Sequence, residues 1–293
     1  MVPSTTRHSP PGREILLVGH YCHDTIIASD GTVRLLLGGA AAHASAVLAP
    51  LGADFRVVAK VGNDFRYGEA VARPPLVVNG APTTAFVDDY RGADRIGRVL
   101  AAAPPIHPAD LGDAPCRVGM ACGIAGEIGP ETLARLRELS DIAVADAQAF
   151  VRRVDPDGRV HAAPPEPSLR AQIERLDWLK LSRSETAALD PSTLKRCGAL
   201  VTDGDRGSIL LQNGRETRVP AFPARELDPT GAGDCYLAGF VWGLLRGWQP
   251  ERAALFGSFC GALAVSRHGV PQLTLADLEP FSGRAPDPGP CAR

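Results

Sequence analysis

The sequence predicts an α/β fold in three layers, with helices on both faces of a mostly parallel central sheet and a small β lid. The first observation is alternation, because short apolar runs closed by glycine or a polar residue are followed by segments of helical period. The second is size, since 293 residues with 45% hydrophobic content can bury one large core. The third is a pair of β-like pieces around the turn Ser29-Asp30-Gly31, with no helix between them. We therefore expect one domain over residues 14–282, with disordered tails at 1–13 and 283–293.

The elements of the N-terminal half follow this pattern in order. Glu14–Gly19 is a short apolar run closed by glycine, which is typical of a buried parallel strand. Lid strands are expected from about 24–37 and 83–100, on either side of an alanine-rich helix over Ala40–Ala49. The other elements expected here are a strand at Phe55–Lys60, a shortened helical piece at Arg66–Arg73 and a strand at Thr83–Tyr90.

The C-terminal half continues the alternation of strand and helix. Pro130–Leu139 is predicted as a helix with proline near its first turn, and Ala253–Arg267 as the last apolar helix. Asp155–Pro167 is polar and rich in proline, so we expect a connection there. The strands expected in this half are Arg117–Ala121, Ile142–Asp146, Leu176–Leu181, Ala199–Thr202 and Ser208–Gln212.

Polar side chains follow several strand ends, where open α/β sheets place the groups that bind ligands. Asp24 lies just past the first strand, and Asp146-Ala147-Gln148 follow a later one. From its position alone, Asp24 is as well explained as a group that binds a ligand as it is as a solvated loop carboxylate. Glu127 either reaches a substrate or belongs to the loop that enters a helix, and we prefer the loop.

Composition excludes several classes of protein. Lys+Arg 31 against Asp+Glu 33 gives a net charge of −2 without a basic block, so we expect no nucleic-acid partner. No apolar run approaches the roughly 20 residues that span a bilayer, and the N-terminus lacks the apolar region of a signal peptide, so we expect no membrane partner. The seven cysteines are scattered and never spaced CxxC. This favours reduced thiols in a cytoplasmic protein, without a zinc site or disulfides.

The most informative stretch is Glu226–Phe240, ELDPTGAGDCYLAGF. A turn of small residues runs straight into an apolar segment of helical period, so the turn lies at a helix N-terminus. Backbone N–H groups there have no intrahelical partner, and the small Gly231, Ala232 and Gly233 allow a phosphate to approach them. Asp234 beside such an anion site suits a base that takes a proton from the group attacking phosphorus. The alternative is that Asp234 only caps the helix and the glycines only turn the chain.

The string DPTGAGD, followed by an aromatic residue and GF, resembles the C-terminal signature of the ribokinase-like (PfkB) carbohydrate kinases. The resemblance extends over nearly the whole chain, including a Gly-Gly turn before the alanine-rich helix and a VGxD turn at Val61–Asp64. It implies a ribokinase-like fold and transfer of phosphate from ATP, with Mg²⁺, to a hydroxyl group. Asp234 would be the general base, and the amides of Gly231, Ala232 and Gly233 would form the anion hole.

The same resemblance implies roles for further residues. Asp24, Gly38, Gly39 and His43 would bind the substrate, although His43 stands where many sugar kinases have Asn. The nucleotide would be bound by Ser182, Thr202, Gly204, Gly207 and Ser258, together with the Gly231–Gly233 turn. Glu185 matches the Glu of an NxxE motif that organises water around Mg²⁺, whereas Ser182 replaces its Asn; a Glu at a helix N-terminus is also common for dipole reasons. Asp228 and Thr230 resemble part of a monovalent-cation site, for which K⁺ is the candidate.

Longer segments, among them VGHYCHDTII, LGGAAAHASAVL and ACGIAGEIGPETL, resemble the plant myo-inositol kinases within this family. The implied activity is ATP-dependent phosphorylation of myo-inositol, a step that feeds phytate synthesis, with a possible homodimer through the lid. The alternatives are another sugar or nucleoside kinase of the ribokinase or fructokinase type, and a ribokinase-like binding protein without catalysis. A dinucleotide-dependent dehydrogenase is excluded, since Val18–Cys22 holds one glycine and not the GxGxxG fingerprint.

Overall fold

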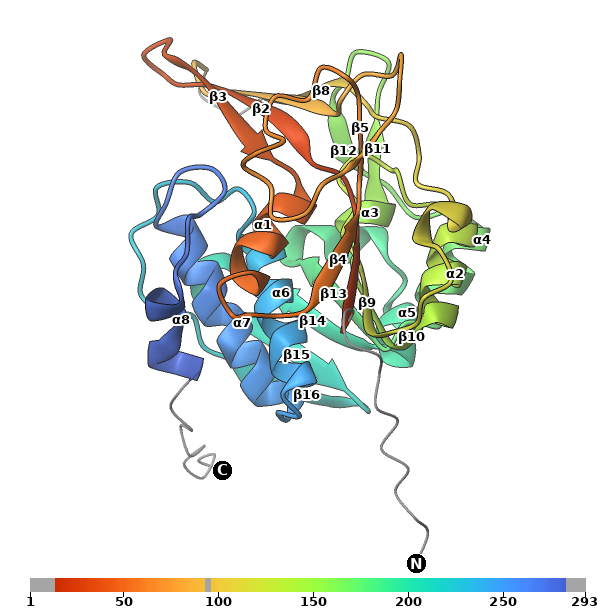
Figure 1. Cartoon of the computed structure of the whole chain (residues 1–293). Helices are drawn as coiled ribbons and strands as arrows, with labels where there is room; N and C mark the ends of the chain where they lie inside the picture. Colours follow the sequence, from red (N-terminus) through yellow and green to blue (C-terminus); the bar gives the residue numbers. More distant parts are fainter. Residues whose placement is uncertain (1–13, 93–95, 283–293) are drawn as a thin grey trace, which may run out of the picture.

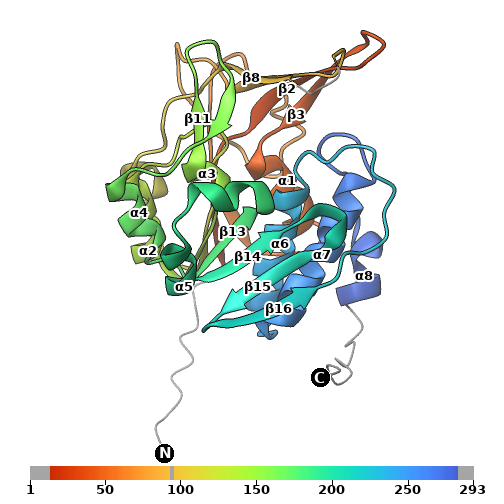
Figure 2. The same cartoon turned by 180° about the vertical axis from the view of Figure 1, so that it is seen from behind.

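The computed structural model describes residues 14–92 and 96–282, and its main feature is an eight-stranded sheet (Figures 1 and 2). The spatial order is β16-β15-β14-β13-β10-β9-β1-β4, and every neighbouring pair from β14 to β4 is parallel. Strands β15 and β16 continue the sheet in antiparallel fashion. The strands are β1 Ile15–Val18, β4 Phe55–Val58, β9 Cys116–Ala121, β10 Ser140–Asp146, β13 Trp178–Ser182, β14 Gly198–Thr202, β15 Ser208–Gln212 and β16 Arg215–Val219. The predicted three-layer α/β class, with a mostly parallel sheet, is confirmed.

Helices cover both faces of this sheet, and the side chains of β1 show the two cores (Figures 1 and 2). Ile15 and Leu17 belong to one buried apolar cluster, whereas the alternating Leu16 and Val18 belong to the other. The first core includes side chains of α1 (Ala40–Leu48), α6 (Ala232–Leu245), α7 (Pro250–Val265) and α8 (Leu275–Ser282). The second includes side chains of α2 (Pro130–Leu139), α3 (Gln148–Val151) and α4 (Pro167–Ile173), while the short α5 (Pro191–Arg196) lies near β14 and β15.

A second sheet of four strands stands at one end of the molecule, above the carboxyl ends of the parallel strands (Figure 1). Its order is β3-β2-β7-β8, and the strands are β2 Cys22–Ile27, β3 Val33–Gly38, β7 Ala85–Asp89 and β8 Ile96–Ala101. These are the segments expected to supply lid strands. The hairpin β11 (Arg152–Val154) and β12 (Val160–Ala162) rises from the main body beside β8, where the Val99 amide donates to the Gly158 carbonyl at 2.8 Å. A short pair, β5 (Lys60–Val61) and β6 (Leu76–Val77), completes the strands.

Three sequence-based expectations differ from the structure. The helical piece predicted over Arg66–Arg73 is wrong: the segment forms turns only, because Gly68 and the following Pro74-Pro75 leave too little chain for a stable helix. The connection predicted over Asp155–Pro167 contains strand β12, and α8 follows the helix that was predicted to be the last. The tails predicted to be disordered, 1–13 and 283–293, lie outside the described residues.

Two absences concern only the part of the chain that the structure describes. None of its helices is both long and apolar enough to cross a bilayer. Six of its cysteines are buried and free.

Candidate active site

The turn that opens α6 is set by Gly231, the N-cap residue of the helix. Its φ of 74° and ψ of 0° lie in the left-handed region, which glycine adopts at little cost. A Cβ at this position would also overlap the imidazole ring of His43 on α1. Asp228 stabilises the approach to the turn, because its Oδ1 accepts the Thr230 amide at 2.9 Å and its Oδ2 accepts the Gly269 amide at 2.9 Å. The turn is therefore fixed where the first backbone N–H groups of α6 lack an intrahelical partner, and of these the Ala232 amide donates to the Pro229 carbonyl at 3.3 Å.

Two cavities meet at this turn, and Thr202, Pro229 and Gly233 line both of them. The larger has a volume of about 840 Å³ and the smaller about 310 Å³. Both lie at the carboxyl ends of the parallel strands, where open α/β sheets bind their ligands.

The larger cavity contains most of the residues predicted to bind the nucleotide. Thr202, Gly204, Gly207, Ala232, Gly233 and Ser258 line it, with an apolar wall that includes Phe222 and Val265. Gly207 has a φ of 87°, and a Cβ there would overlap the Val219 carbonyl, so the turn after β14 requires glycine. The Ser258 hydroxyl donates to the Pro220 carbonyl at 2.7 Å and so ties α7 to the loop that follows β16. Ser182 and Gly231 are the exceptions among the predicted residues, because they line the smaller cavity.

The smaller cavity brings together, from three different elements, residues predicted to bind the substrate and the predicted catalytic base. Asp24 lies on β2, His43 on α1 and Asp234 in the first turn of α6, and all three line this cavity with Gly39. Gly38 lies behind it, where a Cβ would overlap the Asp24 carboxylate. The Cys22 thiol donates to Asp24 Oδ1 at 3.0 Å, and burial raises the pKa of Asp24 above its ordinary value.

His43 is buried, and its two ring nitrogens have different surroundings. Nδ1 lies 3.1 Å from the Gly39 carbonyl, so the tautomer that donates from Nδ1 fits this contact. Burial lowers the pKa of His43, which favours the neutral ring. Nε2 is buried without a protein partner. In this tautomer, Nε2 is an acceptor available to a ligand in the cavity.

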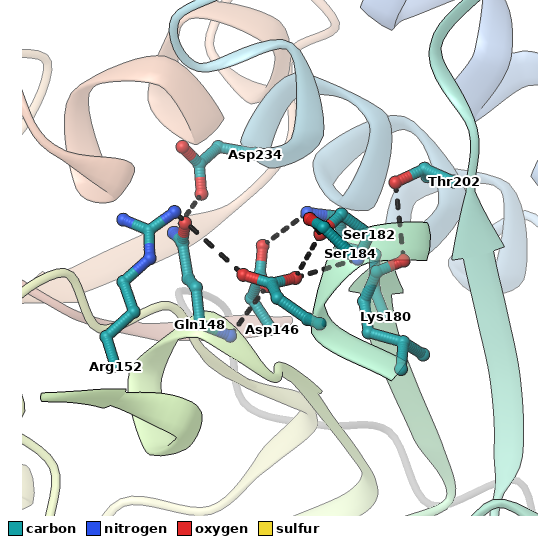
Figure 3. A network of polar contacts seen from close by, with 10 residues as sticks. Asp146, Gln148, Arg152, Lys180, Ser182, Ser184, Thr202 and Asp234 are labelled. Atoms are coloured by element: carbon teal, nitrogen blue, oxygen red, sulfur yellow. Dashed lines mark hydrogen bonds and ion pairs between the residues drawn. The ribbon is translucent and has the colours of Figure 1, made fainter. Parts of the chain in front are cut away.

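Asp234 belongs to a polar network that connects α6 with two strands of the main sheet (Figure 3). The side-chain Nε2 of Gln148 donates to Asp234 Oδ1 at 3.2 Å, and the backbone N–H of Gln148 donates to Asp146 Oδ1 at 3.1 Å. The ammonium of Lys180 lies 2.8 Å from Asp146 Oδ2. Arg152 lines the same cavity, with Nη2 3.9 Å from Glu185 Oε1.

The network changes the acidity of Asp234. Burial is the largest cause and raises its pKa, and the negative charge of Asp146 raises it further. Lys180 and Arg152 act in the opposite direction, and the resulting pKa is about 7. A carboxylate with such a pKa is suited to accept a proton near neutral pH.

Sequence reasoning did not single out Lys180 or Arg152. A charged residue in the middle of the apolar run Trp178–Ser182 was the available signal for Lys180, because a lysine is rarely buried unless it is paired. Asp146 and Gln148 were noticed as polar groups at a strand end. Glu127, for which the loop interpretation was preferred, is buried, and its carboxylate accepts the amides of His20, Ile124 and Ala125.

The predicted metal-site residues make protein contacts of their own. Glu185 Oε2 accepts both the amide and the hydroxyl of Ser182, at 2.7 and 2.8 Å, in a capping box at the end of β13. Thr230 Oγ1 is buried without a partner beside Asp228. Within residues 14–92 and 96–282, no group of three or more His, Cys, Asp and Glu side chains is arranged to hold a metal ion.

A parallel sheet with ligand cavities at its carboxyl edge, and a glycine turn carrying a carboxylate between them, define a small-molecule kinase of ribokinase fold. The family model for pfkB family carbohydrate kinases matches residues 158–275. An inositol 3-kinase of Oryza sativa subsp. japonica is 44% identical over 88% of this chain and 70% of its own length. An inositol 3-kinase of Arabidopsis thaliana is 38% identical over 94% of this chain and 81% of its own length. The chain belongs to the PfkB family of carbohydrate kinases, phosphotransferases with an alcohol group as acceptor.

Solved structures support the fold. A pyrophosphate-dependent kinase in the ribokinase family, complexed with a pyrophosphate analog and myo-inositol, superposes with a TM-score of 0.78 at 22% identity. The match covers 91% of this chain and 99% of that one. A ribokinase from Thermotoga maritima superposes with a TM-score of 0.70 at 19% identity, over 92% of this chain and 99% of that one.

Proposed function

We propose that this protein transfers the γ-phosphoryl group of ATP to a hydroxyl group of myo-inositol. The observation that carries the proposal is the position of Asp234, which lines the smaller cavity next to Gly233, a residue that lines both cavities. The identity of the acceptor rests on relatives that are inositol 3-kinases, 38–44% identical over most of the chain. The product would be an inositol monophosphate, which feeds phytate synthesis.

In the proposed reaction the acceptor occupies the smaller cavity, and Asp24 and His43 bind its hydroxyl groups. Asp234 takes the proton of the attacking hydroxyl as a new O–P bond forms and the bond from γ-phosphorus to the β-phosphate oxygen breaks, which leaves ADP. The amides of Gly231, Ala232 and Gly233 donate to the charge that develops on the transferred group. Gln148 orients the base, because its amide group donates to Asp234 Oδ1.

The larger cavity supports a nucleotide as donor. Its volume of about 840 Å³ lies within the range of 300–1,000 Å³ that is typical of small-molecule sites. Its apolar wall offers a surface for a base that pyrophosphate lacks. The donor is a point to test, since one solved relative is described as pyrophosphate-dependent.

The residues present fit a magnesium ion that takes its ligands from phosphate oxygens and water. Glu185 is the carboxylate placed to hold such water, since Oε1 makes only a long contact with Arg152. The ion would neutralise phosphate charge during transfer. A monovalent cation, K⁺ by preference, would be held near Asp228 and Thr230, where a buried hydroxyl lacks a partner.

We also propose that the four-stranded sheet closes over the acceptor and forms a homodimer contact. Val33 and Leu35 on β3 and Leu100 on β8 are large apolar side chains exposed on this sheet. A second copy would remove that apolar surface from water. The cytoplasm is the proposed location, where the free cysteines would stay reduced.

The test measures turnover by the purified protein with two donors: ADP release with Mg-ATP, and release of inorganic phosphate with Mg-pyrophosphate. Myo-inositol, ribose, fructose and adenosine are supplied separately as acceptors. Asp234→Asn is measured beside Asp113→Asn, a control at a highly exposed aspartate. We expect turnover on myo-inositol in the wild type and in Asp113→Asn, and none in Asp234→Asn. Turnover on another acceptor would refute the substrate, and binding of ATP without turnover on any acceptor would indicate a non-catalytic protein.

A further inference from the structure

Lys180 places a buried positive charge in the smaller cavity, against Gly233, which lines both cavities. It is a register partner of Asp146 in the adjacent parallel strand, so the sheet itself sets the two side chains against each other. Its side chain is 7% exposed and lines the smaller cavity. Burial alone would lower the pKa of Lys180, but the carboxylates of Asp146, Glu185 and Asp234 outweigh it and raise the pKa above the ordinary value. The side chain is therefore an ammonium at neutral pH.

The ammonium lies against the glycine turn that opens α6. A Cβ added to Gly233 would overlap Lys180 Nζ and would lie 3.0 Å from Lys180 Cε and 4.0 Å from Asp146 Oδ2. Gly233 does not have a positive φ, unlike Gly231, so its backbone conformation is open to any residue. Space for the ammonium is therefore one physical reason for glycine at this position.

Lys180 has hydrogen-bonding capacity that the protein leaves unused. An ammonium has three N–H donors. Among the described residues, the single hydrogen bond of Nζ is the one to Asp146. Buried donors are normally satisfied, so the remaining donors at the cavity favour an anionic ligand there.

We propose that Lys180 is a catalytic residue whose ammonium contacts the oxygens of the transferred phosphoryl group beside the Gly233 amide. The inference rests on the proposed kinase function, and it adds a fixed cation to the anion hole. Lys180 donates to the non-bridging oxygens while the O–P bond to the acceptor forms and the bond to ADP breaks. Lys180 neither gains nor loses a proton in the step, because Asp234 receives the hydroxyl proton.

The competing explanation is that Lys180 only neutralises Asp146 within a buried pair. Lys180→Met, Asp146→Asn and the double variant separate the two explanations, because the double variant removes both charges together. We expect Lys180→Met to lower kcat by about 10²–10³-fold, as for loss of one oxyanion donor, with little change in KM for myo-inositol. The double variant is expected to stay equally impaired. Recovery of the double variant to near wild-type kcat would overturn the proposal.

A binding measurement without acceptor provides a readout that does not depend on turnover. Calorimetry with Mg-ATP and Mg-ADP is expected to show that Lys180→Met weakens ATP binding more than ADP binding. Lys60→Met is the matched control, since Lys60 is also buried, pairs with Asp110 at 2.6 Å and lines neither cavity. That control is expected to lower the melting temperature and leave the ATP-to-ADP affinity ratio unchanged.

The outcomes separate this proposal from the proposed function. An unchanged affinity ratio in Lys180→Met would overturn the role of Lys180 even if wild-type protein phosphorylates myo-inositol. Absence of myo-inositol turnover in wild type would refute the acceptor, while the affinity ratio would still report on Lys180. If Lys180→Met does not fold, the ATP-to-ADP affinity ratio and kcat are measured on the double variant instead.

Discussion

Substitution of Gly231 by alanine tests the physical account of the turn that opens α6. The backbone is left-handed at this residue, with a φ of 74°, which costs a residue with a Cβ about 1–2 kcal/mol. The new Cβ would also overlap the ring of His43, which is buried and held by Gly39. Overpacking of this kind typically costs a further ~1–3 kcal/mol. We therefore expect Gly231→Ala to lower the free energy of unfolding by about 2–5 kcal/mol.

Gly247→Ala is a matched control at the other end of the same helix. Gly247 has a φ of 73°, and a Cβ there would meet nothing within 4 Å, so this variant carries only the backbone cost. Urea unfolding of both variants, followed by circular dichroism, gives the difference between them. A second comparison, Gly231→Ala combined with His43→Ala, is expected to recover the steric part of the loss. Equal destabilisation by Gly231→Ala and Gly247→Ala would refute the role assigned to His43.

Three further predictions concern acidity, substrate binding and assembly. The pKa of Asp234 is raised from 3.8 to about 7, so the folded state binds more protons between these values and unfolding free energy falls as pH rises through them. Asp234→Asn is expected to flatten that slope in urea unfolding from pH 4 to 8, and kcat of wild type to fall as the pH drops below 7; a slope identical in both proteins would contradict the assigned pKa. Asp24→Asn is expected to raise KM for myo-inositol by about 10- to 100-fold through loss of a charged acceptor, with ATP affinity unchanged in calorimetry; an equal loss of ATP affinity would place Asp24 outside the acceptor site. Leu35→Lys on the exposed face of β3 is expected to convert the dimer to a monomer in analytical ultracentrifugation. A wild-type protein that is itself monomeric would refute the proposed dimer contact through the lid.

The sequence predicted the elements whose signals are local. Pro130–Leu139 is observed with the predicted bounds because proline marks its first turn and its apolar residues have helical spacing. The hairpin β11–β12 had a local signal that was not used, since Asp157-Gly158 lies between short alternating runs. The segment 66–73 failed because helical spacing over eight residues does not outweigh Gly68 and the prolines that follow.

The parts of the site that sequence reasoning missed depend on pairings between distant residues. Gln148 and Asp234 are 86 positions apart, and Lys180 and Asp146 are 34 apart. The Lys180–Asp146 contact follows from sheet order and strand register, and the Gln148–Asp234 contact joins helices α3 and α6; no local pattern specifies either. The glycine turn could be predicted from neighbouring residues because its backbone conformation depends on them alone. The charges around the turn could not be predicted in this way.

The two glycines of the turn meet different requirements, and this bears on how the kinase motif should be interpreted. In the sequence, Gly231 and Gly233 look equivalent, as small residues that let a phosphate approach backbone amides. In the structure, Gly231 adopts a left-handed conformation against His43, whereas Gly233 has an ordinary conformation against the ammonium of Lys180. Both side chains come from inside the protein, so each glycine accommodates the interior as well as a ligand. We expect Gly233→Ala to cost less activity in a Lys180→Ala background than in wild type, because the group that the new Cβ displaces is already gone. The opposite outcome is a double variant whose fold loss in kcat equals the product of the two single losses. That result would show that glycine at 233 serves the ligand alone.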